Sequence, residues 1–294
     1  MAQSYHPSLA TSARMTLAFL ALSPFVSTLS KSIAPTAILC GCFTALGYAS
    51  QSVALATEAG SNVAFLGAFT VVWCPLLEAV VDKKPSSVID RPQTYLAGLL
   101  CLSGIGVLEL LGTEMTFDFT GELFSILQAI GFGTSFFLTE RMMRKEPGQV
   151  LPITSVQVGM SALISGAWAF FDGGTVPFSL PTEEIGRALE NFGLNSHSVP
   201  VWAVVWTGLI TTALNRLGET AALGKMSTSE ASVLLATEPL FAAVFGFFFT
   251  NESFGPNDYV GGVLIIGACF ANTLKKEQFA GVLDTLKFDN ENKD

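Results

Sequence analysis

Residues 215–252 read NRLGETAALGKMSTSEASVLLATEPLFAAVFGFFFTNE and decide the fold. The second part of this stretch, from about Ser229 to Phe249, is an apolar run of roughly 20 residues, the length that a helix needs to cross a hydrocarbon core of about 30 Å. Glu238-Pro239 lies at the middle of this run. A carboxylate at this depth costs roughly 2.5–3.5 kcal/mol on insertion scales, so Glu238 is expected to face protein or water.

Pro239 is predicted to bend or open the helix beside Glu238, because a proline cannot donate a hydrogen bond to the carbonyl of Leu235. A kinked helix with a carboxyl group at mid-membrane is typical of a substrate path. Burial would raise the pKa of Glu238, so proton coupling through this residue is one hypothesis. The alternative is a structural role, in which the carboxyl group holds the kinked backbone of its own helix.

The composition is that of a polytopic membrane protein. Half of the 294 residues are hydrophobic, 13% are charged, and the mean hydropathy is +0.51. A soluble domain carries about twice this share of charge. The five cysteines lie in apolar segments and the two histidines are far apart, so we predict no metal or cofactor. No nucleophile motif, paired intramembrane aspartates or Ser/His dyad is present, so we do not expect an enzyme. We expect no nucleic-acid partner either.

Apolar runs predict nine membrane helices, at about 8–28, 35–56, 61–81, 93–111, 121–140, 150–171, 200–223, 229–249 and 256–274. Alternation of the connecting loops places twelve of the 15 Lys and Arg residues on one side: Lys31, Lys83, Lys84, Arg91, Arg141, Arg144, Lys145, Lys225, Lys275, Lys276, Lys287 and Lys293. Because basic loops stay in the cytoplasm, the C-terminus is predicted to be cytoplasmic, or to face the stroma or matrix in an organelle.

Two parts of the chain align with each other. The aligned pairs are Pro75 with Pro239, Pro92 with Pro256, Tyr48 with Arg216, and Gln51 with Glu219. The offset is 164 residues for the proline pairs and 168 for the polar pairs, so the first part has about one extra helical turn. Prolines at matching places are typical of transporters that bind substrate at the interface of inverted repeats.

This alignment predicts a first repeat at 6–111, a second at 121–274 and a charged cytoplasmic tail at 275–294. The second repeat contains five predicted helices and the first contains four. The first repeat is therefore expected to lack the first of its five helices. The missing helix would leave a polar cavity exposed unless another chain covers it.

The residues that suggest a family lie in both repeats: His6 to Arg14, Gln51 to Leu66, Ala221 to Leu223, Glu238-Pro239, and Gly261 to Gly267. On these stretches the chain resembles the EamA-type branch of the drug/metabolite transporter superfamily. The resemblance covers about residues 6–275. It implies an all-α, ten-helix bundle of inverted repeats that moves small metabolites by alternating access, of which about nine helices are present here.

The candidate residues of the substrate path are polar or aromatic side chains of the predicted helices: Glu238, Gln51, Tyr48, Arg216, Glu219, Asn215 and Trp73. Pro75 and Pro239 are the candidate kink and gating positions. Arg216 and Glu219, three residues apart, form either a self-neutralising pair that snorkels to the interface or a pair that flanks the cavity opposite Tyr48 and Gln51. For Trp73, the alternative to a place in the substrate path is packing against neighbouring helices.

Other charged residues have simpler interpretations. Arg14, some seven residues inside its helix, is predicted to snorkel or to pair with a carboxylate. Glu78 and Glu140 are predicted to lie at helix ends where water reaches them. Ser227 and Glu230 have the spacing of a helix capping box.

Two functions follow as hypotheses. The first is a secondary carrier of a neutral, zwitterionic or weakly cationic metabolite in a lipid bilayer, with protons as a candidate coupling ion. A dianionic sugar phosphate would need a cluster of Lys or Arg, and only Arg14 and Arg216 lie within helices. The second is a shortened, non-transporting relative that acts as a membrane scaffold or partner subunit. A homodimer is a candidate assembly for either.

Overall fold

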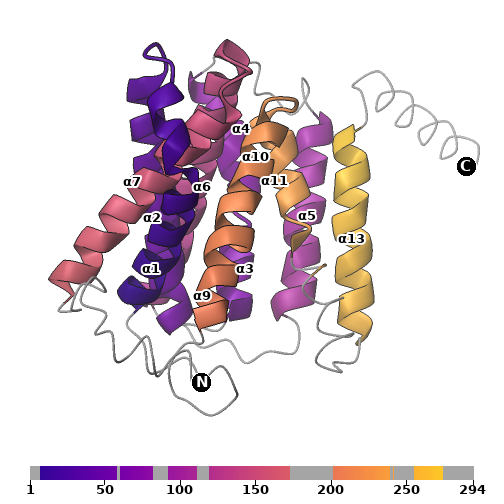
Figure 1. Cartoon of the computed structure of the whole chain (residues 1–294). Coiled ribbons are helices and arrows are strands. Elements are labelled where there is room, and N and C mark those ends of the chain that lie inside the picture. Colours follow the sequence, from indigo (N-terminus) through magenta and orange to yellow (C-terminus); the bar gives the residue numbers. More distant parts are fainter. Residues whose placement is uncertain are drawn as a thin grey trace, which may run out of the picture. The chain divides into compact units, whose positions relative to one another are not determined.

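The computed structural model describes residues 7–57, 60–81, 92–110, 119–172, 201–238, 241 and 255–273, and within these ranges the chain forms helices and no strand (Figure 1). The helices are α1 (Pro7–Leu22), α2 (Ala34–Thr57), α3 (Gly60–Gly67), α4 (Thr70–Val81), α5 (Pro92–Leu110), α6 (Phe119–Lys145), α7 (Val150–Phe171), α9 (Val201–Gly208), α10 (Asn215–Leu223), α11 (Thr228–Leu235) and α13 (Pro256–Thr273). A 3₁₀ turn, η1 (Ser23–Thr28), follows α1, and a π-helix, η2 (Leu209–Leu214), joins α9 to α10.

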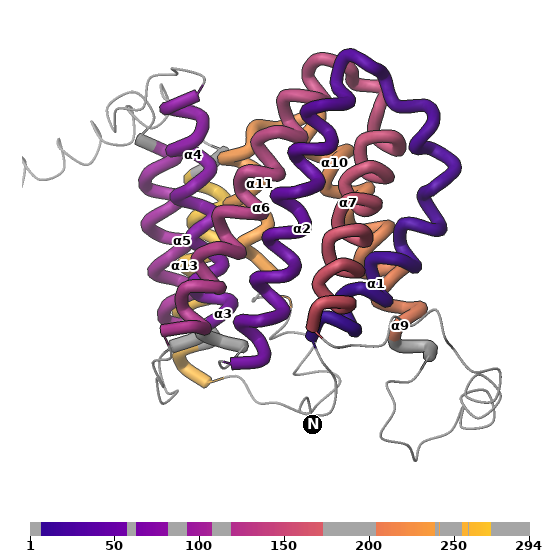
Figure 2. The backbone as a smooth tube through the Cα atoms, turned by 90° about the vertical axis from the view of Figure 1, so that its left-hand side faces the viewer, coloured from indigo at the N-terminus to yellow at the C-terminus, as the bar shows by residue number. Residues whose placement is uncertain are grey.

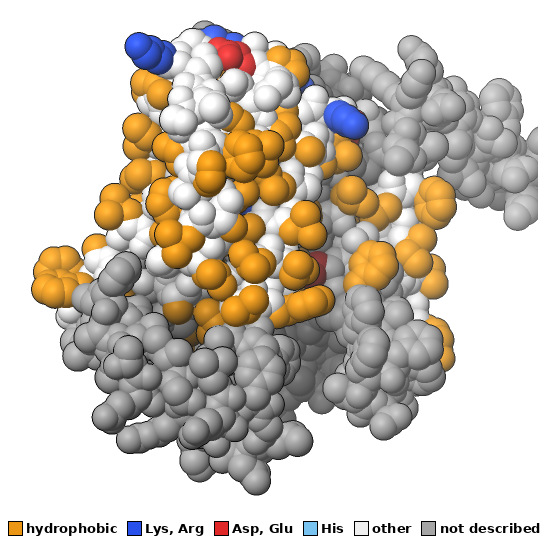
Figure 3. Space-filling view, in the orientation of Figure 1, with side chains coloured by type: hydrophobic (Ala, Val, Ile, Leu, Met, Phe, Trp, Pro, Cys, Tyr) orange, Lys and Arg blue, Asp and Glu red, His pale blue; other side chains and the backbone are white. Residues whose placement is uncertain are grey.

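Five described segments are long and apolar enough to cross a membrane: Pro7–Thr28, Ala34–Thr57, Val63–Val81, Phe119–Lys145 and Val150–Phe171. Large apolar side chains such as Leu20, Leu163 and Phe171 are exposed along them, and hydrophobic side chains spread over the face shown in Figure 3. In a soluble protein so much exposed apolar surface would be unfavourable, whereas lipid covers it at no cost. The chain is therefore a multi-pass membrane protein.

The described helices group into two compact units. The first unit contains α1, η1, α2, α6, α7, α9, η2 and α10, and the second contains α3, α4, α5, α11 and α13. In the first unit α2 runs beside α6 and α7, and α1 packs on α7 (Figure 2). Each unit thus combines helices from both predicted repeats, and the repeat boundaries themselves stay a prediction.

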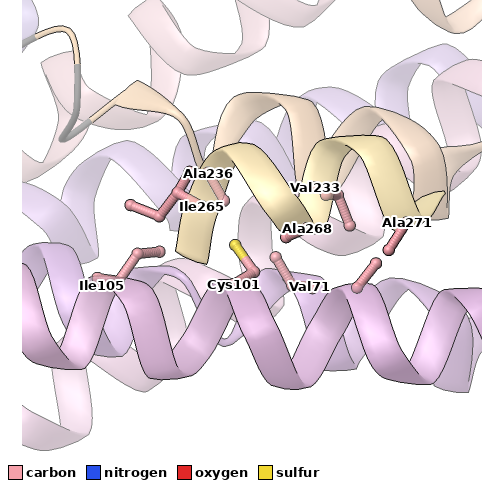
Figure 4. Close-up of a cluster of buried hydrophobic side chains, with 9 residues drawn as sticks. Val71, Cys101, Ile105, Val233, Ala236, Ile265, Ala268 and Ala271 are labelled. Carbon is pink, nitrogen blue, oxygen red and sulfur yellow. The ribbon is translucent and has the colours of Figure 1, made fainter. Parts of the chain in front are cut away.

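The core of the second unit lies between α5 and α13. Its buried apolar side chains come from α5, α13, α4 and the end of α11 (Figure 4). Gly104 allows the close approach, because a Cβ atom at this position would lie 2.9 Å from the carbonyl oxygen of Gly261. The two packed helices begin at Pro92 and Pro256, which the sequence alignment pairs, and proline suits a first helical turn.

Two helices predicted to be continuous are interrupted, at matching positions of the alignment. The predicted helix 61–81 is broken at Ala68-Phe69, and the predicted helix 229–249 is broken at Ala236-Thr237, 168 residues later. The backbone hydrogen bonds around the two breaks correspond: Ala68 N to Ala64 O (3.0 Å) and Phe69 N to Leu66 O (3.1 Å), and Ala236 N to Ser232 O (3.1 Å) and Thr237 N to Leu234 O (3.1 Å).

The prolines do not mark the two breaks equally. Pro75 lies inside the continuous helix α4, several residues after the break at Ala68-Phe69. The offset of 168 therefore holds through the breaks, and the extra turn of the first repeat falls between its break and Pro75. Pro239 lies outside the described residues. Pro75, which was predicted to kink its helix, therefore does not lie at the break of the predicted helix 61–81.

At one end of the first unit, a polar clasp joins the turn before α2 to the turn after α6. The Glu146 carboxylate accepts hydrogen bonds from the hydroxyls of Ser32 and Ser30, the latter at 2.8 Å. Gln149 Oε1 accepts a hydrogen bond from Ser30 N at 2.9 Å. The Ser32 and Ser30 hydroxyls lower the pKa of Glu146.

Candidate functional site

A row of polar side chains runs along one face of α2 in the first unit. Cys40, Thr44, Tyr48 and Ser52 recur every four residues, and this spacing puts them one above another on a helix. At 1.5 Å per residue the row is about 18 Å long. It therefore covers much of the thickness of a membrane with groups that lipid does not satisfy.

Two glycines allow α6 to approach this row closely. A Cβ atom on Gly131 would lie 2.6 Å from the backbone nitrogen of Gly47, and one on Gly47 would lie 2.6 Å from the ring of Phe132. Tyr48 then packs edge-on against Phe132, with ring centroids 4.9 Å apart. The backbone contact between α2 and α6 thus fixes the ring of Tyr48. Sequence reasoning missed this contact, because it depends on which helix packs against α2.

The end of the row formed by Cys40 and Thr44 contacts side chains of α6 and α7. Gln157 Nε2 donates to Thr139 Oγ1 at 2.8 Å and to Cys40 Sγ at 3.2 Å. The hydroxyls of Thr44 and Ser135 are 2.7 Å apart. These side chains are all buried, and interhelical hydrogen bonds of this kind are the usual way to satisfy polar groups inside a membrane bundle.

Arg216 enters this polar cluster from α10. Its side chain is only 2% exposed and donates to Gln157 Oε1 at 3.0 Å and to Ser135 Oγ at 3.3 Å. Its guanidinium carbon also lies 5.7 Å from the centroid of the Phe136 ring. Nε has no hydrogen-bond partner within the described ranges. The predicted snorkelling of Arg216 to the interface is therefore wrong, since the side chain is held among polar groups of three other helices.

Glu219 neutralises Arg216. One carboxylate oxygen pairs with the Arg216 guanidinium, and the other accepts a hydrogen bond from Asn215 Nδ2 at 2.8 Å. The Glu219 side chain is 13% exposed and Asn215 is exposed, so the pair lies at the accessible edge of the buried cluster. The self-neutralising pair of the sequence analysis is confirmed, with Arg216 as its buried member.

The π-helix η2 ends at Leu214, directly before this group. Thr212 Oγ1 bonds the carbonyl of Thr207 at 2.8 Å, five residues back, which follows the wider π turn. One extra residue in a turn rotates all later side chains by about 100°, so η2 determines that Arg216 points toward α2, α6 and α7. Hydropathy could not reveal it, because a π turn leaves the apolar length of the segment unchanged.

Arg14 approaches the row from α1. Its guanidinium carbon lies 5.1 Å from the centroid of the Tyr48 ring. Within the part of the chain that the structure describes, its buried Nε has no hydrogen-bond partner and its guanidinium forms no salt bridge. The predicted pairing of Arg14 with a carboxylate is therefore wrong for the described chain, where an aromatic ring is its neighbour, and its snorkelling stays a prediction.

The remaining candidates belong to the second unit or to other parts of α2. Gln51 is partly exposed on α2, and Trp73 is partly exposed on α4. Glu238 is exposed, so its predicted burial is wrong; the backbone break at Ala236-Thr237 ends α11 before it. The structure thus brings together Arg216, Glu219 and Asn215 beside the row of Tyr48, whereas Trp73, Pro75 and Glu238 belong to the other unit.

Two acidic side chains that were predicted to reach water are buried. Glu78 is 1% exposed and accepts hydrogen bonds from Ser229 N (3.1 Å) and Ser229 Oγ (2.7 Å). It therefore caps the N-terminus of α11, where a carboxylate is favourable. Glu140 is also buried and pairs with Arg144 on the next turn of α6. Across the described ranges, no group of three His, Cys, Asp or Glu side chains could hold a metal ion.

Comparisons with known proteins agree with this architecture. A solved crystal structure of a protein superposes with a TM-score of 0.68, covering 92% of this chain and 88% of that chain. At 14% sequence identity this likeness shows the fold alone. No curated protein sequence matches. The EamA-like transporter family matches residues 119–274, just over half of the chain. With this match, the chain belongs to the EamA-like transporter family of the drug/metabolite transporter superfamily.

Proposed function

We propose that this protein is a secondary carrier of a small organic solute that is neutral, zwitterionic or weakly cationic. The observation that supports it most directly is the buried polar cluster around Arg216, which is built by α2, α6, α7 and α10 in a membrane-spanning unit. Charged groups inside a membrane are costly, and those that persist commonly face a solute or ion path. Membership of a transporter family supports the same conclusion.

The charges of the cluster favour this class of solute. Glu219 already neutralises Arg216, so the pair as a whole presents no net charge to a ligand. A dianionic phosphate would need several uncompensated basic groups for charge-assisted hydrogen bonds. A solute with no net charge, by contrast, can exchange hydrogen bonds with Asn215, Glu219 and Gln51 without a large desolvation cost.

The matched helix breaks support alternating access. Helices that break at corresponding positions of two repeats allow segments to move as rigid bodies about short hinges. We therefore assign the hinges to Ala68-Phe69 and Ala236-Thr237. We also propose proton coupling. Burial of Glu238 is not its physical basis, because Glu238 is exposed.

The proposal includes an orientation, with the C-terminus on the cytoplasmic, stromal or matrix side. The basic residues at the C-terminal end of α6, Arg141, Arg144 and Lys145, would then lie on that same side. A protease added to sealed right-side-out vesicles should leave a C-terminal epitope intact. Light scattering of the purified protein distinguishes a monomer from the candidate homodimer.

Reconstitution into liposomes tests the carrier directly. The protein is mixed with lipid, and the liposomes are incubated with a defined pool of neutral, zwitterionic and cationic metabolites that is analysed by mass spectrometry. We expect saturable accumulation of at least one solute above protein-free liposomes. Monodisperse protein that accumulates none of them would contradict the proposal and favour the scaffold or partner-subunit alternative.

A further inference from the structure

Arg14 is a cation at membrane depth. It lies seven residues after the start of α1, about 10 Å along the helix, and Tyr48 lies nine residues before the end of α2, about 13 Å along it. The two helix ends are neighbours, because Thr11 of α1 and Ser52 of α2 have hydroxyls 2.6 Å apart. The guanidinium that lies over Tyr48 is therefore well inside the span Pro7–Thr28.

In the described part of the first unit, no acidic side chain balances the positive charge of Arg14. Arg216 is paired with Glu219, and Arg144 is paired with Glu140. Arg14 is different: in the described ranges its guanidinium interacts with an aromatic ring and forms no salt bridge. A cation left uncompensated inside a membrane is unfavourable, so an arriving anion gains the full interaction.

The contact with Tyr48 leaves Arg14 able to bind a ligand. A ring that lies over a guanidinium attracts its charge through one face and uses none of the five N–H donors, which lie in the plane of the group. Because Tyr48 is itself held edge-on by Phe132, the guanidinium rests on a fixed platform. Arg14 and Tyr48 are both partly exposed, so neither side chain is fully enclosed by the protein.

We propose that Arg14, positioned by Tyr48, binds a single carboxylate group of the transported solute. The planar fork of a guanidinium matches a carboxylate with two parallel hydrogen bonds, and one guanidinium compensates one negative charge. This inference rests on the proposed carrier function and narrows its solutes to those with one carboxylate. Zwitterions such as amino acids are the class that also satisfies the neutral overall charge.

The neighbouring polar groups fit such a ligand. Gln51 lies three residues after Tyr48 on α2 and is partly exposed. Thr11 lies three residues before Arg14 on α1, and its hydroxyl already engages Ser52. The carboxylate end of a solute would thus meet the cation over Tyr48 and an amide about one turn further along α2, and both groups donate hydrogen bonds to an anion.

Binding of acids against amides tests the site. The probes are a pool of α-amino acids with short monocarboxylic acids, and the matching pool in which each carboxyl group is a carboxamide. The readout is protection of the detergent-purified protein from thermal unfolding. We expect the acid pool to protect the wild type and the amide pool to give at least about tenfold weaker apparent affinity, since the charge-assisted pair is lost.

The variants are Arg14→Gln, Arg14→Lys and the matched control Arg141→Gln. Arg141 also stacks on an aromatic ring, that of Phe137 at 5.3 Å, but it is exposed at the end of α6. Arg14→Gln should weaken acid binding at least about tenfold, Arg14→Lys should retain part of it, and Arg141→Gln should match the wild type. Protection by acids and amides alike, or by neither, would overturn the inference.

The outcome separates this inference from the carrier proposal. If the wild type and Arg14→Gln take up the same solutes at the same rates into liposomes, the carrier stands and the carboxylate site falls. If acids protect the protein through Arg14 yet no solute crosses the bilayer, the site stands and the carrier falls. The acid and amide comparison needs no variant, so it decides the question even where Arg14→Gln does not fold.

Discussion

Removing the two charges of the Arg216–Glu219 pair should have unequal effects. In Glu219→Gln the guanidinium of Arg216, 2% exposed, keeps only neutral partners such as Gln157 and Ser135. In Arg216→Gln the carboxylate that remains is 13% exposed and keeps the amide of Asn215. The first change leaves a buried charge uncompensated, and the second leaves a charge that water can reach.

The size of the difference follows from general values for buried pairs. An uncompensated buried charge costs roughly 3–5 kcal/mol. The neutral acceptors of Arg216, which are Gln157, Ser135 and Thr44, reduce this toward about 3 kcal/mol. The exposed carboxylate of the reverse variant should cost about 1–2 kcal/mol, mainly from lost hydrogen bonds. At about 2–4 °C per kcal/mol, Glu219→Gln should lower Tm by about 6–12 °C and Arg216→Gln by about 2–8 °C.

Thermal unfolding of both single variants and of the double variant in one detergent measures this. The double variant should be more stable than Glu219→Gln alone, because it removes the orphaned charge. The effects of the two changes should therefore not add. The reasoning is refuted if Arg216→Gln lowers Tm as much as Glu219→Gln, or if the two losses are simply additive.

Three further predictions concern helix packing, helix capping and the charge of Glu146. Gly131→Ala should destabilise by about 1–3 kcal/mol, because the new Cβ meets backbone atoms of α2, whereas Gly148→Ala, with nothing within 4 Å, should match the wild type in thermal unfolding. Ser229→Ala should cost about 1–3 kcal/mol by weakening the capping of α11 by buried Glu78, and a thermal loss no larger than that of an exposed serine would contradict this. Glu146, whose pKa is lowered by two serine hydroxyls, should stabilise the protein above about pH 4.5, and this advantage over Glu146→Gln should vanish as the pH falls through the lower folded pKa; equal Tm differences at pH 6 and pH 3 would contradict it.

Local chemistry was readable from the sequence. The capping box of α11 is confirmed, with Glu230 N donating to Ser227 Oγ at 3.3 Å and Ser227 N donating to Glu230 Oε2 at 2.8 Å. The starts of α5 and α13 at Pro92 and Pro256 lie within a residue of the predicted bounds. These features depend on neighbours within a few residues, so composition and spacing are sufficient to predict them.

Features that depend on neighbouring helices were not readable. The π turn before Asn215 and the break at Ala68-Phe69 leave the hydropathy of their segments unchanged, so no periodicity marks them. The position of Arg14 over Tyr48 is set by the packing of α1 on α2, and the burial of Glu78 by that of α4 on α11. The burial of Glu238 was predicted from its depth in the membrane alone, and depth does not determine which way a side chain faces.

Trans-stimulated uptake tests the carrier account most directly. Liposomes that contain the protein are either preloaded with an unlabelled solute identified in the uptake screen or left empty, and entry of the isotope-labelled solute is followed. A carrier that alternates between two faces returns faster when loaded, so the account predicts faster entry into preloaded liposomes. Equal entry into preloaded and empty liposomes, or entry no faster than into protein-free liposomes, would contradict it.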